Sequence, residues 1–317
     1  MTTQHQSHSR TNTVRDMKKL SRHSVGPRKG VGHYIAWACM IFVIVITVLP
    51  FYWMIRTSFS SATGLSANPG SLIPTDFTLD AYRRVFGLVD LQENLAQGGA
   101  GSAMNFWLYL RNSAIVAFVT MAGQTLFSAM AAYAFARLRW RGRDTVFAIF
   151  LSALMIPSIF TTIPNFVLIK DLGLLNTFAG IVAPTFFMTP FAIFFLRQFF
   201  LGIPREIEEA ARIDGASSLA TFFKVIVPMS KAPIITLAVL TFINAWNDYL
   251  WPLLVGQREE VRVLTVALGI FRSQTPQGSP DWPGLMAGAL MAAVPIMLLF
   301  IILGKRIVNN LGFSGLK

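Results

Sequence analysis

The chain has 317 residues, of which 54% are hydrophobic and 13% are charged. Because charged residues make up about 25% of an ordinary soluble domain, this composition excludes a soluble globular enzyme and indicates an integral membrane protein. The single cysteine, Cys39, excludes a disulfide framework and a thiolate metal site. All four histidines precede residue 34, which leaves the rest of the chain without an imidazole for acid–base catalysis.

The N-terminal segment, residues 1–33, concentrates positive charge, with seven basic residues against the single acid Asp16. It is rich in Ser, Thr, Gln and His and has no apolar period, so we expect it to be disordered. The net charge of +12 leaves a nucleic-acid-binding arm as an alternative. A basic flank that holds the first span's start in the cytoplasm is the better explanation, so we expect no nucleic-acid partner.

Six runs with at most one charge follow, each long enough for a helix to cross the bilayer. None alternates with the two-residue period of a barrel strand, so we predict an all-α integral membrane protein with six transmembrane helices. Prolines interrupt several of these runs. The runs are residues 34–55, 112–136, 145–169, 172–196, 232–256 and 282–304.

The expected organisation follows from these runs and from the charges between them. Residues 1–33 form the tail, 34–55 the first helix, 56–111 an extracytoplasmic loop, 112–307 a five-helix core and 308–317 the C-terminal tail. The connections at 137–144 (+3) and 197–231 (+1) and residues 305–317 (+3) are net positive, whereas 56–111 and 257–283 are neutral. The positive segments therefore face the cytoplasm, and so do both termini.

The two outer loops have features of their own, although plain connecting loop is the alternative for both. Residues 77–86 are expected to form a short amphipathic helix capped by Thr78. The Gly-rich patch near Gly98 is expected to be a flexible linker, and residues 275–280 form a Pro/Gly-rich tip.

The one long polar block between apolar runs is residues 204–228. Pro204 suits the first position of a helix, and Gly215 suits its end because glycine readily adopts positive φ. Ser217 or Ser218 can cap a second helix that closes at Pro228. An amphipathic connector lying on the lipid surface is the alternative reading of this pattern alone.

The fifth run contains a polar group that is costly to place in a bilayer. Asn244 and Asp248 are four residues apart on one helix face, and Asn247 lies on the adjoining edge. They are candidates for the wall of a substrate pathway, with Trp246 as an aromatic stacking surface for the substrate. Hydrogen bonding between helices is the alternative.

The block at residues 204–228 carries a family resemblance. Glu209-Ala210-Ala211, three residues, Gly215, nine residues and Val225-Ile226-Val227-Pro228 resemble the EAA loop of ATP-binding-cassette (ABC) importer permeases. The family pattern is Glu-Ala-Ala, three residues, Gly, nine residues and Ile-x-Leu-Pro, and this chain has valine at the two aliphatic positions. From the first outer loop onward it is similar to carbohydrate-type permeases of maltose and trehalose importers, with further likeness at residues 245–248, 261–264 and 313–317.

The resemblance implies a type I importer permease fold in a bacterial inner membrane, with a cytoplasmic EAA coupling loop. The implied partners are a second permease subunit in a heterodimer, two copies of an ABC ATPase and an extracytoplasmic solute-binding protein. Residues 261–275 would help to release substrate from that protein. Glu209 would form an ion pair with the ATPase, and the implied coupling residues are Glu209, Ala210, Ala211, Asp214, Gly215 and Pro228.

No catalytic function is expected of this chain. No lysine stands in the Gly-x-x-x-x-Gly-Lys-Ser/Thr pattern of a nucleotide-binding loop, so ATP and Mg²⁺ would be used by a separate ATPase and this chain would bind no cofactor. Without basic residues inside the spans, a neutral sugar or oligosaccharide is the expected cargo. The alternatives are an importer for glycerol phosphate, polyamine or another small solute, and a secondary transporter that acts alone.

Overall fold

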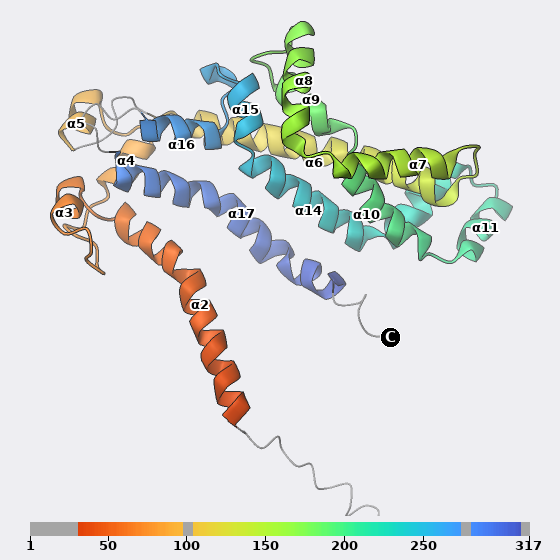
Figure 1. Cartoon of the computed structure of the whole chain (residues 1–317), viewed down its shortest axis with the longest axis horizontal. Coiled ribbons are helices and arrows are strands. Elements are labelled where there is room, and N and C mark those ends of the chain that lie inside the picture. The colour runs from red at the N-terminus through yellow and green to blue at the C-terminus, as the bar shows by residue number, and fades with distance from the viewer. Residues whose placement is uncertain (1–30, 98–103, 274–279, 312–317) are drawn as a thin grey trace, which may run out of the picture. The chain divides into compact units, whose positions relative to one another are not determined.

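The computed structural model describes residues 31–97, 104–273 and 280–311, and every regular element in these ranges is helical (Figure 1). Several expectations fall on residues outside the described part. They concern most of the N-terminal tail, the linker near Gly98, most of the tip at residues 275–280 and the last six residues. The chain divides into two units, residues 1–53 and 54–317, and each is described by itself.

The first unit contains most of α2 (Val31–Ser58), which is somewhat longer at both ends than the predicted 34–55. It is 28 residues long and has a mean hydropathy of 2.4 over its most apolar window. Apolar side chains cover it on all sides and are exposed from Val31 to Trp53. A helix that is apolar all round needs lipid or protein as its surroundings, as expected for a transmembrane helix.

The second unit begins with a folded segment rather than a plain loop. It contains α3 (Ala62–Ala67), α4 (Asp80–Val85) and α5 (Leu91–Ala96). The buried Arg56 donates from Nε to the carbonyl of Ile73 (3.3 Å) and from Nη2 to the carbonyl of Asn68 (3.1 Å). The helix expected at 77–86 is α4, but its cap differs. Leu79 holds the N-cap position, and Thr78 accepts from the Asp80 N–H instead.

The centre of the second unit is α6 (Phe106–Arg137), a continuous helix of 32 residues. It packs along α10 (Pro190–Leu201) and α14 (Lys231–Asn247) and against α9 (Phe178–Phe186) (Figure 1). Gly123 permits the close approach of α9, because a Cβ at this position would collide with the ring of Phe186.

Two of the predicted spans are sharply bent. The first joins α7 (Arg143–Ser152) and η1 (Ala153–Met155) to α8 (Ser158–Asp171) at 103°, and the second joins α9 to α10 at 44°. Pro157 is the N-cap residue of α8 and Pro190 is the first residue of α10. Proline suits a helix start because its missing N–H is not needed there.

The polar block and the fifth run are also divided into several short helical segments. The block forms α11 (Arg205–Ile213) and then a helical stretch made of α12 (Ser218–Thr221), the π-helical η2 (Phe222–Ile226) and α13 (Val227–Met229). This stretch meets α14 at 84°. The prediction of one continuous fifth helix was wrong, because α14 ends at Asn247 and α15 (Leu250–Val255) follows an extended Asp248.

The remaining elements are η3 (Glu259–Val261), α16 (Leu264–Ser273) and α17 (Trp282–Leu311). In the part of the chain that the structure describes, three helices are long and apolar enough to cross a membrane, namely α2, α6 and α17. The number rises to six if each of the three bent pairs is one span. Two of these pairs correspond to the predicted runs 145–169 and 172–196, whereas the third joins residues 218–229 of the polar block to α14 and differs from the predicted run 232–256.

Buried side chains form several packed clusters in the second unit. The largest joins the C-terminal half of α6 to α7, α10, η2 and α14 around Leu196, Phe200 and Phe222. A second joins α4, the start of α6, α16 and α17 around Phe106 and Leu264. These clusters hold the polar block against α6 at one end of that helix and α4 against α6 at the other.

Candidate functional site

The helix expected to contact an ATPase, α11, has an exposed surface with a prominent apolar side chain. Ile213 is 86% exposed, and Glu209 and Ala210 are also exposed. Asp214 is the C-cap residue, and Gly215 follows with φ of +83°. Ile213 and Glu209 are therefore both accessible to another protein.

The turn after α11 is a Schellman motif, so the prediction that Gly215 ends this helix is confirmed. The Gly215 N–H donates to the Arg212 carbonyl (3.0 Å), and the Ala216 N–H donates to the Ala211 carbonyl (2.9 Å). This pair of bonds requires the left-handed conformation that glycine adopts without strain.

The other predicted boundaries of the block are close to the observed ones. Pro204 is the N-cap residue and not the first helical residue of α11. Ser217 caps the second helix by accepting from the Ala220 N–H (3.2 Å). The helical stretch ends at Met229, one residue after Pro228, and widens into a π-turn just before this proline. A proline removes one backbone donor and clashes with the carbonyl four residues earlier, which explains the local change of winding.

A buried ion pair, which the sequence analysis missed, fixes α11 to the helix core. Arg137 Nε at the end of α6 lies 3.0 Å from Oε1 of Glu208, and the two side chains are 4% and 6% exposed. Nη2 of Arg137 also donates to the carbonyls of Phe200 and Ile203, at and just beyond the end of α10. One guanidinium therefore joins α6, α10 and α11.

This pair changes how the glutamates of α11 are interpreted. Glu208 serves the fold of this chain, whereas the adjacent Glu209 is exposed and forms no ion pair with another described residue. The carboxylate of Glu209 is thus available to a second protein. Its pairing with an ATPase stays a prediction, as do the roles of the other coupling residues.

The second part of the candidate site is a cavity of about 620 Å³ between α6, α8, α9, α14 and α15. Asn244, Asn247 and Asp248 line it together, as the sequence spacing predicted. Asp248 is the single acid in the lining, and the lining contains no Lys, Arg or His. Side chains with hydroxyl or amide groups make up the rest of the polar wall: Thr120, Gln124, Ser158, Thr161, Thr162, Asn165, Thr185 and Thr241.

The polar face of α8 was missed although the sequence contains its signal. Ser158, Thr161, Thr162 and Asn165 follow the i, i+3, i+4, i+7 spacing of one helix face and all line the cavity. Thr161 and Thr162 donate to the Ser158 carbonyl at 2.8 and 3.1 Å, so each keeps its oxygen lone pairs for a ligand. Searching the apolar runs for such a polar stripe would have found these residues.

Trp246 does not line this cavity, which corrects its expected place beside the asparagines. Its side chain is buried, stacks on Phe242 with ring centroids 5.5 Å apart and donates from Nε1 to the Ala292 carbonyl of α17 (3.1 Å). Trp246 lies on the opposite side of α14 from the cavity-lining Asn244 and Asp248, and here the alternative of bonding between helices describes the contact.

The other members of the fifth-run group have mixed environments. Asn247 donates to the Ile243 carbonyl of its own helix (2.9 Å). The Asp248 carbonyl accepts from Thr265 Oγ1 of α16 (2.6 Å), and its side chain precedes the first turn of α15. A carboxylate at that place is favoured by the positive end of the helix dipole.

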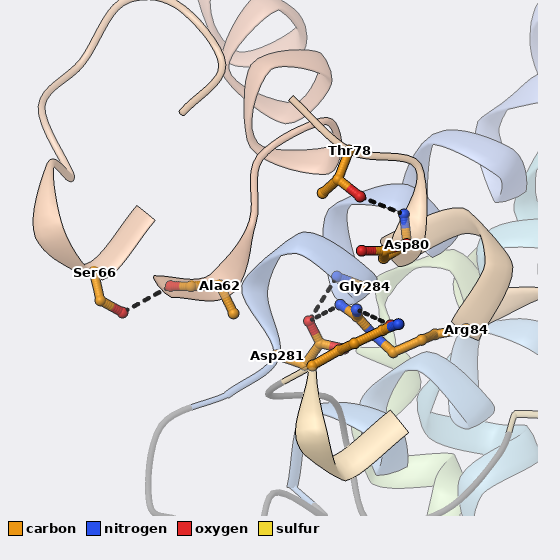
Figure 2. A network of polar contacts seen from close by, with 8 residues as sticks. Ala62, Ser66, Thr78, Asp80, Arg84, Asp281 and Gly284 are labelled. Atoms are coloured by element: carbon orange, nitrogen blue, oxygen red, sulfur yellow. Dashed lines mark hydrogen bonds and ion pairs between the residues drawn. The ribbon is translucent and has the colours of Figure 1, made fainter. Parts of the chain in front are cut away.

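A second buried ion pair lies at the other end of the unit (Figure 2). Arg84 of α4 binds Asp281 through two bonds, Nε to Oδ2 (3.1 Å) and Nη2 to Oδ1 (3.0 Å), and both residues are 3% exposed. Asp281 Oδ1 also accepts from the Gly284 N–H in the first turn of α17 (2.9 Å). Arg84 thereby attaches α4 to the start of α17.

The sequence matches a family model described as binding-protein-dependent transport system inner membrane component over residues 124–312. It is 33% identical to the arabinooligosaccharides transport system permease protein AraQ of Halalkalibacterium halodurans, over 89% of this chain and 97% of that protein. It is 32% identical to the sn-glycerol-3-phosphate transport system permease protein UgpE of Brucella abortus, over 89% of this chain and 95% of that protein.

The diacetylchitobiose uptake system permease protein NgcG of Streptomyces coelicolor is 30% identical over 87% of this chain and 86% of that protein. Among solved structures, a bacterial ABC transporter involved in the import of the acidic polysaccharide alginate matches with a TM-score of 0.73. That match covers 88% of this chain and 98% of the other at 24% identity, which supports the type I permease fold. The chain therefore belongs to the family of binding-protein-dependent transport system inner membrane components, the permease subunits of ABC importers.

Proposed function

We propose that this permease carries a neutral sugar or oligosaccharide. The observation that supports this cargo is the cavity of about 620 Å³, whose polar wall consists of hydroxyl and amide groups with one carboxylate. Such groups exchange hydrogen bonds with sugar hydroxyls as both donors and acceptors. The volume lies within the usual range of ligand sites, about 300–1,000 Å³.

A glycerol phosphate is the second candidate, because UgpE of Brucella abortus is named for that solute. A phosphate group is normally bound by arginine, lysine or several backbone N–H groups. The cavity lining offers no basic side chain, which disfavours this cargo unless a second permease subunit supplies the charge. A polyamine would require more than the single carboxylate of Asp248.

The proposed assembly contains a second permease subunit as a heterodimer, two copies of an ABC ATPase and an extracytoplasmic solute-binding protein in the bacterial inner membrane. ATP and Mg²⁺ would act in the ATPase subunits. The exposed Ile213 and Glu209 of α11 support a contact with the ATPase. This contact requires α11 and both termini to lie in the cytoplasm, as the net positive charge of residues 137–144 and 197–231 favours.

The test of coupling is ATP hydrolysis by the complex reconstituted with and without its binding protein. Glu209→Ala is expected to abolish the stimulation by binding protein while the chain still inserts and assembles. Uptake without ATP, or a complex that contains no ATPase, would instead support a secondary transporter.

The test of cargo is competition for uptake by unlabelled sugars and by glycerol 3-phosphate, followed by variants of the cavity. Thr162→Val is expected to raise the KM for uptake about 2- to 10-fold, the effect of one lost neutral hydrogen bond. Thr236→Val is the matched control, because Thr236 bonds to its own helix at the Ala232 carbonyl and does not line the cavity. Equal KM values for the two variants would contradict the assignment of this cavity.

A further inference from the structure

A second cavity, of about 470 Å³, lies where α6 ends, α7 begins and α11 begins. Its lining is dominated by arginine. It shares no residue with the lining of the cavity of about 620 Å³ that is described above. The charged and aromatic residues in its lining are Arg137, Arg139, Trp140, Arg143, Asp144 and Arg205.

Two of these arginines are already neutralised within the chain. Arg137 is paired with Glu208. Arg143 forms two bonds to Asp144, Nε to Oδ1 (2.9 Å) and Nη2 to Oδ2 (3.3 Å). These two arginines therefore add no net positive charge to the cavity.

The remaining two arginines give the cavity its uncompensated positive charge. The guanidinium groups of Arg139 and Arg205 form no ion pair or hydrogen bond with another residue that the structure describes, and both residues are exposed. They come from segments far apart in the sequence and line one cavity. Arginine forms forked, charge-assisted bonds to phosphate, so this pair suits an anion with several oxygens.

The position of the cavity selects the source of that anion. Arg137 ends the apolar span of α6, and Trp140 beside it is 41% exposed. Tryptophan and arginine next to the end of a span are typical of the membrane–water boundary. Basic pockets between helices at this level bind anionic lipid headgroups. Gly142, the N-cap residue of α7, supplies no side-chain cap, so the positive end of that helix adds to the potential.

We propose that this cavity binds a phosphate group, supplied by the headgroup of an anionic phospholipid, between Arg139 and Arg205. Arg205 is the first residue of α11, so a bound headgroup links the start of α7 to the start of the coupling helix. The lipid then restrains α11 at the end opposite to its exposed Ile213. This role is independent of which solute the permease carries.

The test uses the full-length chain in its co-purified complex, examined in detergent by native mass spectrometry. Phosphatidylglycerol, phosphatidylcholine and inorganic phosphate are titrated separately. Arg139→Gln/Arg205→Gln is expected to weaken one phosphatidylglycerol site about 25-fold, since each basic residue near an anionic headgroup contributes about a factor of five. Arg141→Gln is the matched control, because Arg141 lies in the same loop and outside the cavity lining, and it should bind as the wild type does.

The other outcomes separate the possible ligands. Displacement of the bound lipid by millimolar inorganic phosphate would keep the anion site and assign it to free phosphate. Unchanged phosphatidylglycerol binding in the double variant would overturn the proposal. Loss of the ATPase from the complex with unchanged lipid binding would also overturn it, because the arginines would then belong to a protein interface.

Discussion

Replacing Glu208 with glutamine is expected to destabilise the chain although the change removes only one charge. Glu208 is 5% exposed, and its carboxylate is the counter-ion of the Arg137 guanidinium, which would stay charged and buried. An arginine side chain stays protonated in proteins, so the variant retains the cost of a buried charge without a counter-ion. The neighbouring Glu209 is exposed, so Glu209→Gln makes the same chemical change without exposing a buried charge.

The structure also sets the size of the effect. Removing one partner of a buried ion pair costs about 3–5 kcal/mol. Arg137 keeps its bonds to the carbonyls of Phe200 and Ile203 in the variant, so the expected loss is at the lower end, about 3 kcal/mol. Glu209→Gln should change the free energy of unfolding by less than about 0.5 kcal/mol, as surface substitutions usually do.

Unfolding of the purified complex in mild detergent, followed by tryptophan fluorescence, measures this difference. A third variant, Arg137→Met/Glu208→Met, separates lost packing from the unpaired charge, because replacing both partners of a buried pair is often neutral. It should recover only part of the stability that Glu208→Gln loses, because the carbonyls of Phe200 and Ile203 also lose the Arg137 donor. If Glu208→Gln and Glu209→Gln unfold alike, the pair does not fix α11 and the reasoning is refuted.

Two further substitutions test other contacts by the same unfolding assay. Arg84→Ala should lower the free energy of unfolding by about 3–5 kcal/mol, because Asp281 stays buried without its partner. The control Arg83→Ala should lower it by at most about 1 kcal/mol, since Arg83 is half exposed. Similar losses in the two variants would contradict a special role for Arg84. Gly215→Ala should lower the free energy of unfolding by about 1–2 kcal/mol, because residue 215 has a φ of +83°. The control Gly202→Ala should lower it less, since the φ of −76° at residue 202 suits alanine. An unchanged stability of the Gly215→Ala protein would mean that the turn rearranges without strain.

The sequence predicted the features that depend on local chemistry. Gly215 ends α11 because the turn needs positive φ, and the residue that supplies it is visible in the sequence. The spacing of Asn244 and Asp248 correctly placed both on one wall, since four residues return a helix to the same face. Proline marks the positions of two bends, at Pro157 and Pro190, but not their angles of 103° and 44°.

Features that depend on contacts between distant segments could not be predicted in this way. Arg84 and Asp281 are 197 residues apart, and no pattern in one sequence pairs them. The same holds for Arg137 and Glu208, where spacing gave no reason to prefer Glu208 to Glu209. The break at Asp248 was missed for another reason, because a window long enough to detect a span averages over a two-residue interruption.

The three jointed spans give α6 a particular place in the proposed importer. Thr120 and Gln124 of α6 line the cavity of about 620 Å³, and Arg137 at the end of α6 fixes α11 through Glu208. About 20 Å of uninterrupted helix separates Gln124 from Arg137, at 1.5 Å per residue. In the proposed importer, a displacement of α11 would reach the cavity along this continuous helix. The neighbouring spans bend by 44° to 103°, and the bend between α9 and α10 is attached to α6 by the hydrogen bond from Gln124 Nε2 to Thr189 Oγ1 (3.0 Å).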